Sequence, residues 1–222
     1  PYCPYFKELY YEQQAGFFGE SLIREIESHK GWLKGKEIKS LYIGGGTPTL
    51  LNKYLIRAID RLRELCTLQT VALETTPQEI NNRVTVELGR MGCNMISLGV
   101  QDFNPKYLDF LGRKYSVPDV FRAINKLEQL NFRNFNIDLI FAMPGQTMAE
   151  LDHTLQIAVD TGADQLTLYP LFTFPYSVIG KSQELSHVKM PNGKTRKQMY
   201  FHICNTLTSK GYEQASVWSF LK

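Results

Sequence analysis

The sequence predicts an α/β fold built from repeated strand–helix units. Segments rich in β-branched and apolar residues, typical of strands, recur at 38–45, 69–75, 94–101, 135–144 and 164–171. Amphipathic stretches with apolar residues at three- and four-residue spacing lie between them. Repeated units of this kind require a parallel sheet with right-handed crossovers. An open doubly wound sheet and a (β/α) barrel both satisfy this pattern, and periodicity alone does not choose between them.

The helices follow from the spacing of their apolar residues. A first helix is expected at about 14–30, ahead of the first visible strand. The segments 54–66 and 120–130 each place their leucines and isoleucines on one face, as a helix packed against a sheet requires. The segment 172–193 is rich in Phe, Tyr, Pro and Lys and has no clear period. No regular element is predicted there.

For one helix, the sequence predicts where the helix begins and where it ends. Thr147 followed by Glu150 is a capping-box signature, and Gly162 is a plausible stop for the same helix. The strand before it contains "LIFAM", which is apolar at every position. We therefore expect strands buried on both faces, in a sheet covered by helices or closed into a barrel.

The composition is that of a globular domain. The chain has 222 residues, of which 43% are hydrophobic and 21% charged, and a formal net charge of +3. This charge is too small to indicate nucleic acid or an anionic membrane as a partner. The basic run 194–197 is expected on a solvated helix start. No stretch reaches the ~18 apolar residues that a membrane span needs, so no membrane span is predicted.

The four cysteines show no disulfide-framework spacing and fit a reducing, cytoplasmic compartment. Cys66, Cys93 and Cys204 lie in apolar helical or turn contexts, where a small buried side chain is expected. Cys3 is different, because the prolines and aromatics of "PYCPYF" flank it without a helical period. A start without methionine in such a loop indicates a fragment that lacks its first residues.

Polar residues fall at corresponding places along successive strands. Glu74 ends the second strand, Gln101 ends the third and Asp138 interrupts the apolar fourth. In βα architectures the carboxyl ends of the strands meet at the face where ligands bind. Glu74 could instead cap a helix or pair with an arginine, Gln101 could close a turn, and Asp138 could pair with Arg113. Their shared register favours a common site.

The stretch "GGGTPT" (44–49) is a glycine-rich turn between a strand and a helix. Three glycines allow backbone N–H groups to approach a ligand closely. The stretch lacks both GxGxxG and GK[ST], so a pyrophosphate loop is not indicated. A tight structural turn is the alternative to a contact with a small polar group such as a carboxylate or an amine.

Four segments in order resemble the signatures of one family. "YIGGGTPTLL", "ISLGVQDFNPKYLDFLGRKYS", "NIDLIFAMPGQT" and "LTLYPL" look like those of radical S-adenosylmethionine (SAM) enzymes of the oxygen-independent coproporphyrinogen III oxidase family. The resemblance runs over nearly the whole chain. It implies a partial, open (β/α)6-type radical SAM barrel of parallel strands with outer helices, whose first strand is missing. The domain would span 1–222, truncated inside the cluster loop and again at the C-terminus.

The resemblance also implies a 4Fe–4S cluster and SAM as cofactors. Family members hold the cluster with a CxxxCxxC loop, and "PYCPYF" is similar to its end, so Cys3 would be the third cysteine. Tyr2 matches a position beside it. With one cysteine of three, this fragment is not expected to retain a stable cluster.

Several residues of this chain match positions that contact SAM in the family, and the resemblance implies a contact for each of them. Gly45 would meet the methionine amino group, and Gly46 and Thr47 would line a neighbouring second SAM site. Glu74 would bind the ribose hydroxyls, and Phe172 falls near the adenine. Further polar contacts to SAM are matched by Gln101, Arg113 and Asp138.

The implied reaction is reductive cleavage of SAM to a 5′-deoxyadenosyl radical that acts on a tetrapyrrole, with an electron donor such as flavodoxin or ferredoxin. No further catalytic residue is assigned. The ending "QASVWSF" (214–220) departs from the oxidase pattern and resembles a haem-utilisation branch. A haem-binding chaperone of the same superfamily is the alternative, so the substrate is porphyrin or haem and the reaction stays open.

Overall fold

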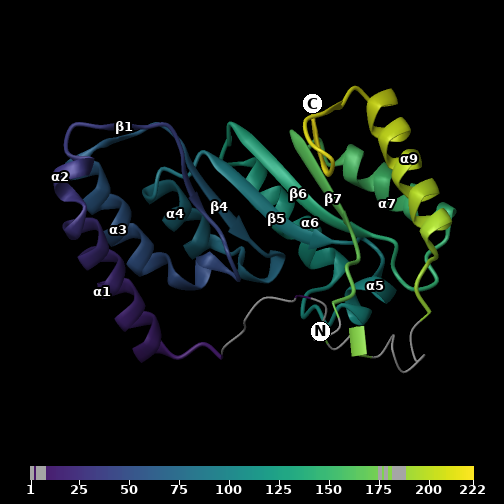
Figure 1. The fold of residues 1–222 in the computed structure, drawn as a ribbon, viewed down its shortest axis with the longest axis horizontal. Helices are drawn as coiled ribbons and strands as arrows, with labels where there is room; N and C mark the ends of the chain where they lie inside the picture. Colours follow the sequence, from purple (N-terminus) through teal and green to yellow (C-terminus); the bar gives the residue numbers. More distant parts are fainter. Residues whose placement is uncertain (1–2, 4–8, 175–176, 178–179, 182–188) are drawn as a thin grey trace.

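The computed structural model describes residues 3, 9–174, 177, 180–181 and 189–222. Its main sheet has seven strands in the order β2-β4-β5-β6-β7-β9-β8 (Figure 1). Five of these strands run parallel: β2 (Leu41–Ile43), β4 (Val71–Thr75), β5 (Met95–Gln101), β6 (Asn134–Phe141) and β7 (Gln165–Pro170). The predicted parallel sheet is therefore confirmed.

The strand order selects the barrel-type architecture. Along the parallel part of the sheet, each strand lies beside the strand that follows it in the chain. A doubly wound sheet would instead reverse its order at a switch point. The predicted strand 38–45 is divided into β1 (Glu37–Ile38) and β2. The predicted strand 69–75 corresponds to β4 and is preceded by β3 (Thr67–Leu68), which forms a separate parallel pair with β1. The (β/α)-barrel type is the correct alternative.

Helices form an outer layer around this sheet. In Figure 1 they lie behind and beside the curved sheet, whose other face is turned toward the viewer. The helices of the described part are α1 (Glu12–Ser28), α2 (Lys30–Leu33), α3 (Asn52–Leu65), α4 (Asn82–Arg90), α5 (Pro105–Phe110), α6 (Val117–Glu128), α7 (Met148–Asp160) and α9 (Gly193–Ser209). Two 3₁₀ turns, η1 (Pro48–Leu51) and η2 (Pro77–Glu79), follow β2 and β4. The helices predicted at about 14–30, 54–66 and 120–130 are confirmed as α1, α3 and α6.

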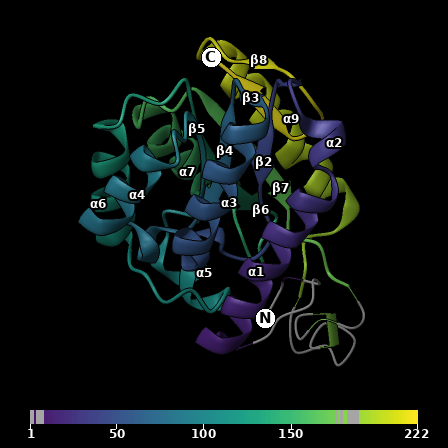
Figure 2. The same ribbon diagram turned by 90° about the vertical axis from the view of Figure 1, so that its left-hand side faces the viewer.

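The first helix packs outside the third. Figure 2 shows α1 and α3 side by side, over the end of the sheet that holds β2 and β4. Arg57 of α3 donates to Glu20 of α1 at 2.6 Å. Arg61 pairs with Glu27 in the same way one turn further on. Both ion pairs lie at the surface and are partly exposed, so each contributes about 1 kcal/mol or less and chiefly fixes the register of the two helices.

The predicted cap of α7 is confirmed. Thr147 is its N-cap: its Oγ1 accepts from the Glu150 N–H at 3.2 Å, and the Glu150 carboxylate accepts from the Thr147 N–H at 2.8 Å. The helix ends at Asp160, and Gly162 follows with φ +72°, a conformation that favours glycine. This reciprocal cap fixes where the chain turns back after β6.

The two faces of the sheet differ, which corrects one expectation. In β6, Phe135, Ile137 and Leu139 are buried in the core against the helices, whereas Asn136 and Asp138 line a cavity on the other face. The expectation of strands apolar on both faces holds only for the last part of β6, where Ile140 packs in a second apolar cluster. The earlier part of the strand alternates because its inner face borders a cavity rather than a packed layer.

The C-terminal end of the sheet was not predicted. Strand β9 (Ser219–Leu221) pairs antiparallel with β7, and β8 (Glu213–Gln214) pairs with β9. The basic run 194–197 lies in the first turn of α9, as expected of a solvated helix start. None of the helices in the described part of the chain is long and apolar enough to cross a membrane.

Candidate functional site

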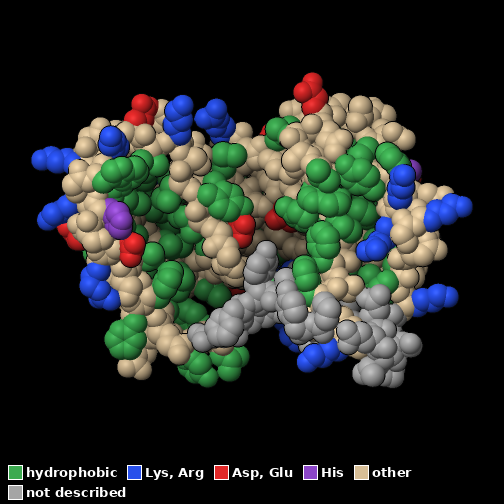
Figure 3. Space-filling model, in the orientation of Figure 1, with side chains coloured by type: hydrophobic (Ala, Val, Ile, Leu, Met, Phe, Trp, Pro, Cys, Tyr) green, Lys and Arg blue, Asp and Glu red, His purple; other side chains and the backbone are tan. Residues whose placement is uncertain are grey.

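A cavity of about 290 Å³ lies on the open face of the sheet. In Figure 3 the corresponding face is hollowed at its centre, and acidic side chains show inside the hollow. Each strand of the sheet from β2 to β9 contributes to its lining, with Tyr42, Glu74, Ser97, Asp138, Thr167 and Ser219. Among the described residues that line it, none is Lys, Arg or His. The cavity is therefore acidic and rich in hydrogen-bonding groups.

Glu74 joins two neighbouring strands and the glycine turn. Tyr42 of β2 donates its hydroxyl to Glu74 Oε1 at 2.6 Å, and the Gly45 N–H donates to Oε2 at 3.0 Å. Burial raises the pKa of Tyr42, and the bond to Glu74 raises it further, so the tyrosine stays a donor at neutral pH. Glu74 thus points toward the glycine turn.

The glycine turn is shaped by positive φ angles. Gly45 has φ +86° and Gly46 has φ +64°, values that other residues adopt only with strain. At Gly44 a Cβ would lie 2.9 Å from Glu74 Oε1, so the first glycine of the run allows the carboxylate to approach. Thr47 follows as the residue before η1. The three glycines are exposed, which leaves their backbone open to a ligand.

Asp138 is held by neutral partners on the inner face. Its carboxylate accepts from Ser97 Oγ at 2.6 Å and from Asn136 Nδ2 at 2.8 Å. Asn136 in turn accepts from Thr167 Oγ1 at 2.9 Å, which ties β6 to β7. Burial raises the pKa of Asp138, the two hydrogen bonds oppose the shift, and the charge of Glu74 adds to it. The suggested pairing of Asp138 with Arg113 is not what the structure shows.

Gln101 lies on a bulge at the end of β5. The register between β5 and β6 shifts between Gly99 and Gln101, and Gln101 has φ +73°. Its side chain folds back over Gly99, where a Cβ would lie 2.7 Å from Gln101 Nε2. Bulges and positive φ at non-glycine residues are typical of places where a strand redirects a side chain for function. The predicted position of Gln101 at a strand's carboxyl end is confirmed.

Arg113 lies behind this bulge, near Tyr115. Its guanidinium carbon lies 5.9 Å from the centroid of the Tyr115 ring. The Tyr115 hydroxyl donates to the backbone oxygens of Gly99 and Val100, at 2.8 Å and 3.0 Å. Arg113 is therefore linked to the end of β5 rather than to the cavity lining, which does not include it.

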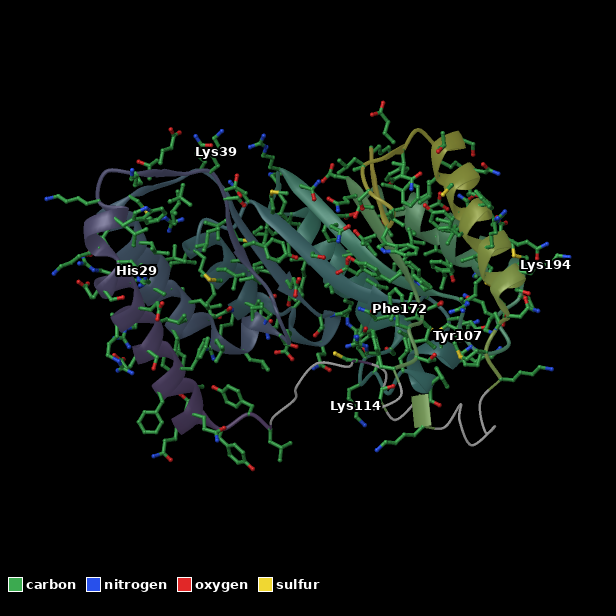
Figure 4. All side chains as sticks on the ribbon, in the orientation of Figure 1. His29, Lys39, Tyr107, Lys114, Phe172 and Lys194 are labelled. Carbon is green, nitrogen blue, oxygen red and sulfur yellow. The ribbon has the colours of Figure 1, made fainter. Side chains whose placement is uncertain are left out.

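The remaining predicted residues are more scattered. Phe172 follows β7 and is 45% exposed, and Figure 4 places it just below the carboxyl end of that strand. Cys3 is half-buried and is not in a disulfide. Tyr2 lies outside the described residues. The structure thus brings Glu74 and Asp138 to one cavity, with Gly45 bonded to Glu74. Gln101, Arg113 and Phe172 lie near the carboxyl ends of the neighbouring strands.

Several lining residues were not predicted. Tyr42 is a partner of Glu74, and Ser97 and Asn136 are partners of Asp138, while Thr167 holds Asn136 in place. Their signal was the alternation of polar residues at every second position of β5, β6 and β7, which marks one face of each strand. The apolar run "LIFAM" concealed this alternation in β6.

The residues present fit SAM well. SAM carries a cationic sulfonium and ribose hydroxyls, which suit a cavity with two carboxylates and no basic side chain in its described lining. The residues present fit a 4Fe–4S cluster less completely than they fit SAM. Cys66 and Cys93 precede strands, at the edge of the sheet opposite the glycine turn, and Cys204 lies on α9. No group of three or more metal-binding side chains occurs among the described residues.

Comparison with known proteins identifies the class. A model of the radical SAM superfamily matches residues 1–158, and the chain belongs to this superfamily. The superfamily's cofactors, a 4Fe–4S cluster and SAM, are thereby implied for this chain.

Individual relatives narrow the class further. The heme chaperone HemW of Lactococcus lactis is 30% identical over 223 residues, covering 99% of this chain and 58% of the relative. The oxygen-independent coproporphyrinogen III oxidase of Escherichia coli is 28% identical over 206 residues, covering 91% and 45%. The solved structure of E. coli HemN, a coproporphyrinogen III oxidase described as a radical SAM enzyme, matches with a TM-score of 0.87 at 27% identity, covering 100% and 52%. The chain spans about half the length of these relatives.

Proposed function

We propose that this chain is the core of a radical SAM protein that binds SAM at the glycine turn and acts on a tetrapyrrole. The observation that carries this is the contact of Glu74 with Gly45, which joins the glycine turn to a carboxylate at the cavity. An acidic cavity beside exposed backbone donors suits a ligand with both an amino acid end and hydroxyl donors. The predicted single domain over 1–222 and the cytoplasmic location are part of the same proposal.

Each residue then has a stated task. Gly45 meets the amino group at the methionine end of SAM, and Gly46 and Thr47 line a neighbouring second SAM site. Glu74, which also accepts from the Tyr42 hydroxyl and the Gly45 N–H, accepts from the ribose hydroxyls. Asp138 holds negative charge near the sulfonium, and Gln101, Arg113 and Phe172 complete the rim. Cys3 supplies one thiolate to the cluster, with Tyr2 beside it. When bound, the cluster and SAM supply radical chemistry by one-electron reductive cleavage of SAM, with electrons from a donor such as flavodoxin or ferredoxin.

A binding measurement on Glu74 tests the proposal. In the full-length protein with all its cluster cysteines, Glu74→Ala removes hydrogen bonds to a charged acceptor, so we expect SAM affinity to fall about ten- to a hundredfold with the cluster retained. Isothermal titration calorimetry measures the affinity, and iron content monitors the cluster. Glu128→Ala, at an exposed position on α6, is the matched control and should bind SAM like wild type. Unchanged SAM affinity in Glu74→Ala would remove Glu74 from the site.

A haem-binding carrier is the second candidate, favoured by the similarity to a heme chaperone. The two functions differ in their products. An enzyme forms 5′-deoxyadenosine in proportion to altered tetrapyrrole under anaerobic conditions. A carrier binds haem and transfers it unchanged. Measuring deoxyadenosine and tetrapyrrole products in one anaerobic assay with haem and with coproporphyrinogen III therefore decides between them.

A further inference from the structure

An aromatic cluster surrounds Trp218, next to the cavity. The indole ring meets Tyr200 at 5.6 Å and Phe172 at 6.4 Å, both nearly edge-on, and Tyr169 at 6.4 Å. Its backbone is fixed as well, because the Leu168 N–H donates to the Trp218 oxygen at 2.8 Å. We refer to Tyr169, Phe172, Tyr200 and Trp218 as the aromatic ledge. The ledge joins β7, the turn before β9 and helix α9.

The ledge is open to solvent and continuous with the cavity. Tyr169 is 40% exposed and also lines the cavity, and Phe172 is 45% exposed. Figure 3 shows hydrophobic side chains gathered on the right-hand side of the hollow, over β7, β9 and α9. Exposed aromatic rings gathered beside a polar cavity mark a binding surface rather than a packed core.

Charge is distributed unevenly around this surface. The cavity contributes the carboxylates of Glu74 and Asp138. On α9, Lys197 Nζ lies 5.7 Å from the centroid of the Phe201 ring, and that ring is 5.9 Å from Tyr200. In Figure 3, Lys and Arg side chains border the hydrophobic patch on the side away from the hollow. A ligand with anionic arms would therefore place them toward α9 and away from the cavity.

We propose that the aromatic ledge binds the flat face of a carboxylated tetrapyrrole, with a carboxylate toward Lys197 and another edge of the ring toward the cavity. Aromatic rings offer the π-surface that a conjugated macrocycle stacks on, and Lys197 offers the matching charge. This proposal rests on the proposed function and adds the residues and the orientation.

Substitutions on the ledge test the proposal in the full-length protein. The probe is coproporphyrin III, and its affinity is measured by the change in its absorption band. We expect Tyr169→Ala to weaken binding about two- to tenfold, as the loss of one ring contact predicts. Phe121→Ala is the matched control, since Phe121 is also a 40% exposed aromatic but lies on α6. Trp218→Ala removes the central ring of the ledge. Trp218→Phe keeps an aromatic ring at this position and serves as the second variant if Trp218→Ala does not fold.

The charge is tested separately. Lys197→Gln should weaken coproporphyrin binding about two- to fivefold at low ionic strength, and the loss should shrink at high salt because screening removes the charge term. The loss in Tyr169→Ala should not depend on salt. Lys39→Gln is the control, because Figure 4 shows Lys39 at the opposite end of the molecule.

The outcomes separate the two proposals. If coproporphyrin binds all folded variants with wild-type affinity, the ledge is a structural cluster that holds β9 against α9. The inference about the ledge then fails, and the proposed function is not affected. If the wild-type protein binds SAM but neither coproporphyrin nor haem, the tetrapyrrole part of the proposed function fails with it. If Tyr169→Ala weakens SAM rather than porphyrin, the ledge belongs to the adenine site and the inference is overturned.

Discussion

Asp138 shows how a carboxylate is kept inside a sheet without a counter-charge. Ser97 and Asn136 satisfy its oxygens, and Thr167 holds Asn136 in place. Neutral donors oppose the cost of burial without neutralising the carboxylate. The pKa of Asp138 is raised because the effect of burial is larger than that of the hydrogen bonds. Burial and the neighbouring charge of Glu74 thus disfavour the charged form of Asp138, and a cationic ligand at the cavity would stabilise it.

Asp138→Asn separates a ligand contact from a structural role. The substitution keeps the shape and removes the charge. We expect the melting temperature to stay near that of wild type, because the partners are neutral, and deoxyadenosine production to be lost. Differential scanning calorimetry and an anaerobic product assay measure the two effects. Early unfolding or full activity would assign Asp138 to the framework.

Gly99 is expected to be a positioning residue for Gln101. A Cβ at this position would meet Gln101 Nε2 at 2.7 Å, so Gly99→Ala should displace the glutamine side chain. Because the end of a flexible side chain can move, the effect on stability should be small. SAM affinity should fall about two- to tenfold, the loss of one neutral hydrogen bond.

Gly89→Ala is the control for this substitution. Gly89 lies inside α4, and nothing lies within 4 Å of a Cβ built there. Alanine should therefore stabilise the protein by about 0.5–1 kcal/mol and leave SAM affinity unchanged. A Gly99→Ala protein with wild-type SAM affinity would show that Gln101 does not reach the ligand.

At the scale of elements, local signals predicted structure well and pairing partners poorly. The cap at Thr147 and the stop at Gly162 were predictable because both act within a few residues. The antiparallel pair β8–β9 was not, because strands of two and three residues carry no measurable period. The bond of Tyr42 to Glu74 joins different strands, so only the folded sheet reveals it.

The cap of α7 gives a prediction about stability alone. Thr147→Ala removes the acceptor of the Glu150 N–H, and we expect the free energy of unfolding to fall by about 1 kcal/mol. Chemical denaturation measures this change. SAM affinity should be unaffected, since neither residue lines the cavity. A loss of affinity would mean that the start of α7 positions part of the site.

At the scale of the whole molecule, the side chain of Asp102, which follows strand β5, is hydrogen-bonded to helix α7. Its side chain has no exposed surface, and Oδ1 accepts from the Asn104 N–H at 2.8 Å and from Thr154 Oγ1 of α7 at 3.0 Å. Oδ2 has no hydrogen-bond partner. Burial raises the pKa of Asp102 from 3.8 to about 6 against these bonds, with a smaller contribution from Glu150 of α7.

This pKa predicts a pH-dependent stability. Between about pH 4 and pH 6 the folded protein holds the proton and the unfolded chain does not, so stability falls as pH rises through this window. Asp102→Asn removes the titration. The difference in unfolding free energy between wild type and variant should change by about 2 kcal/mol from about pH 4 to about pH 7. A constant difference across this range would contradict the raised pKa.

The strand order also has a consequence for how the chain folds during its synthesis. Each parallel strand pairs with the one completed just before it, so a ribosome-bound chain can add one strand and one helix at a time to an existing sheet. Each such contact closes a loop of about one strand–helix unit rather than one that spans the whole chain. The hairpin of β8 and β9 is the exception, because β9 returns to β7 only after α9 has emerged. Until then the growing sheet presents β7 as a bare edge, the stage at which a nascent chain would be most prone to pair with another.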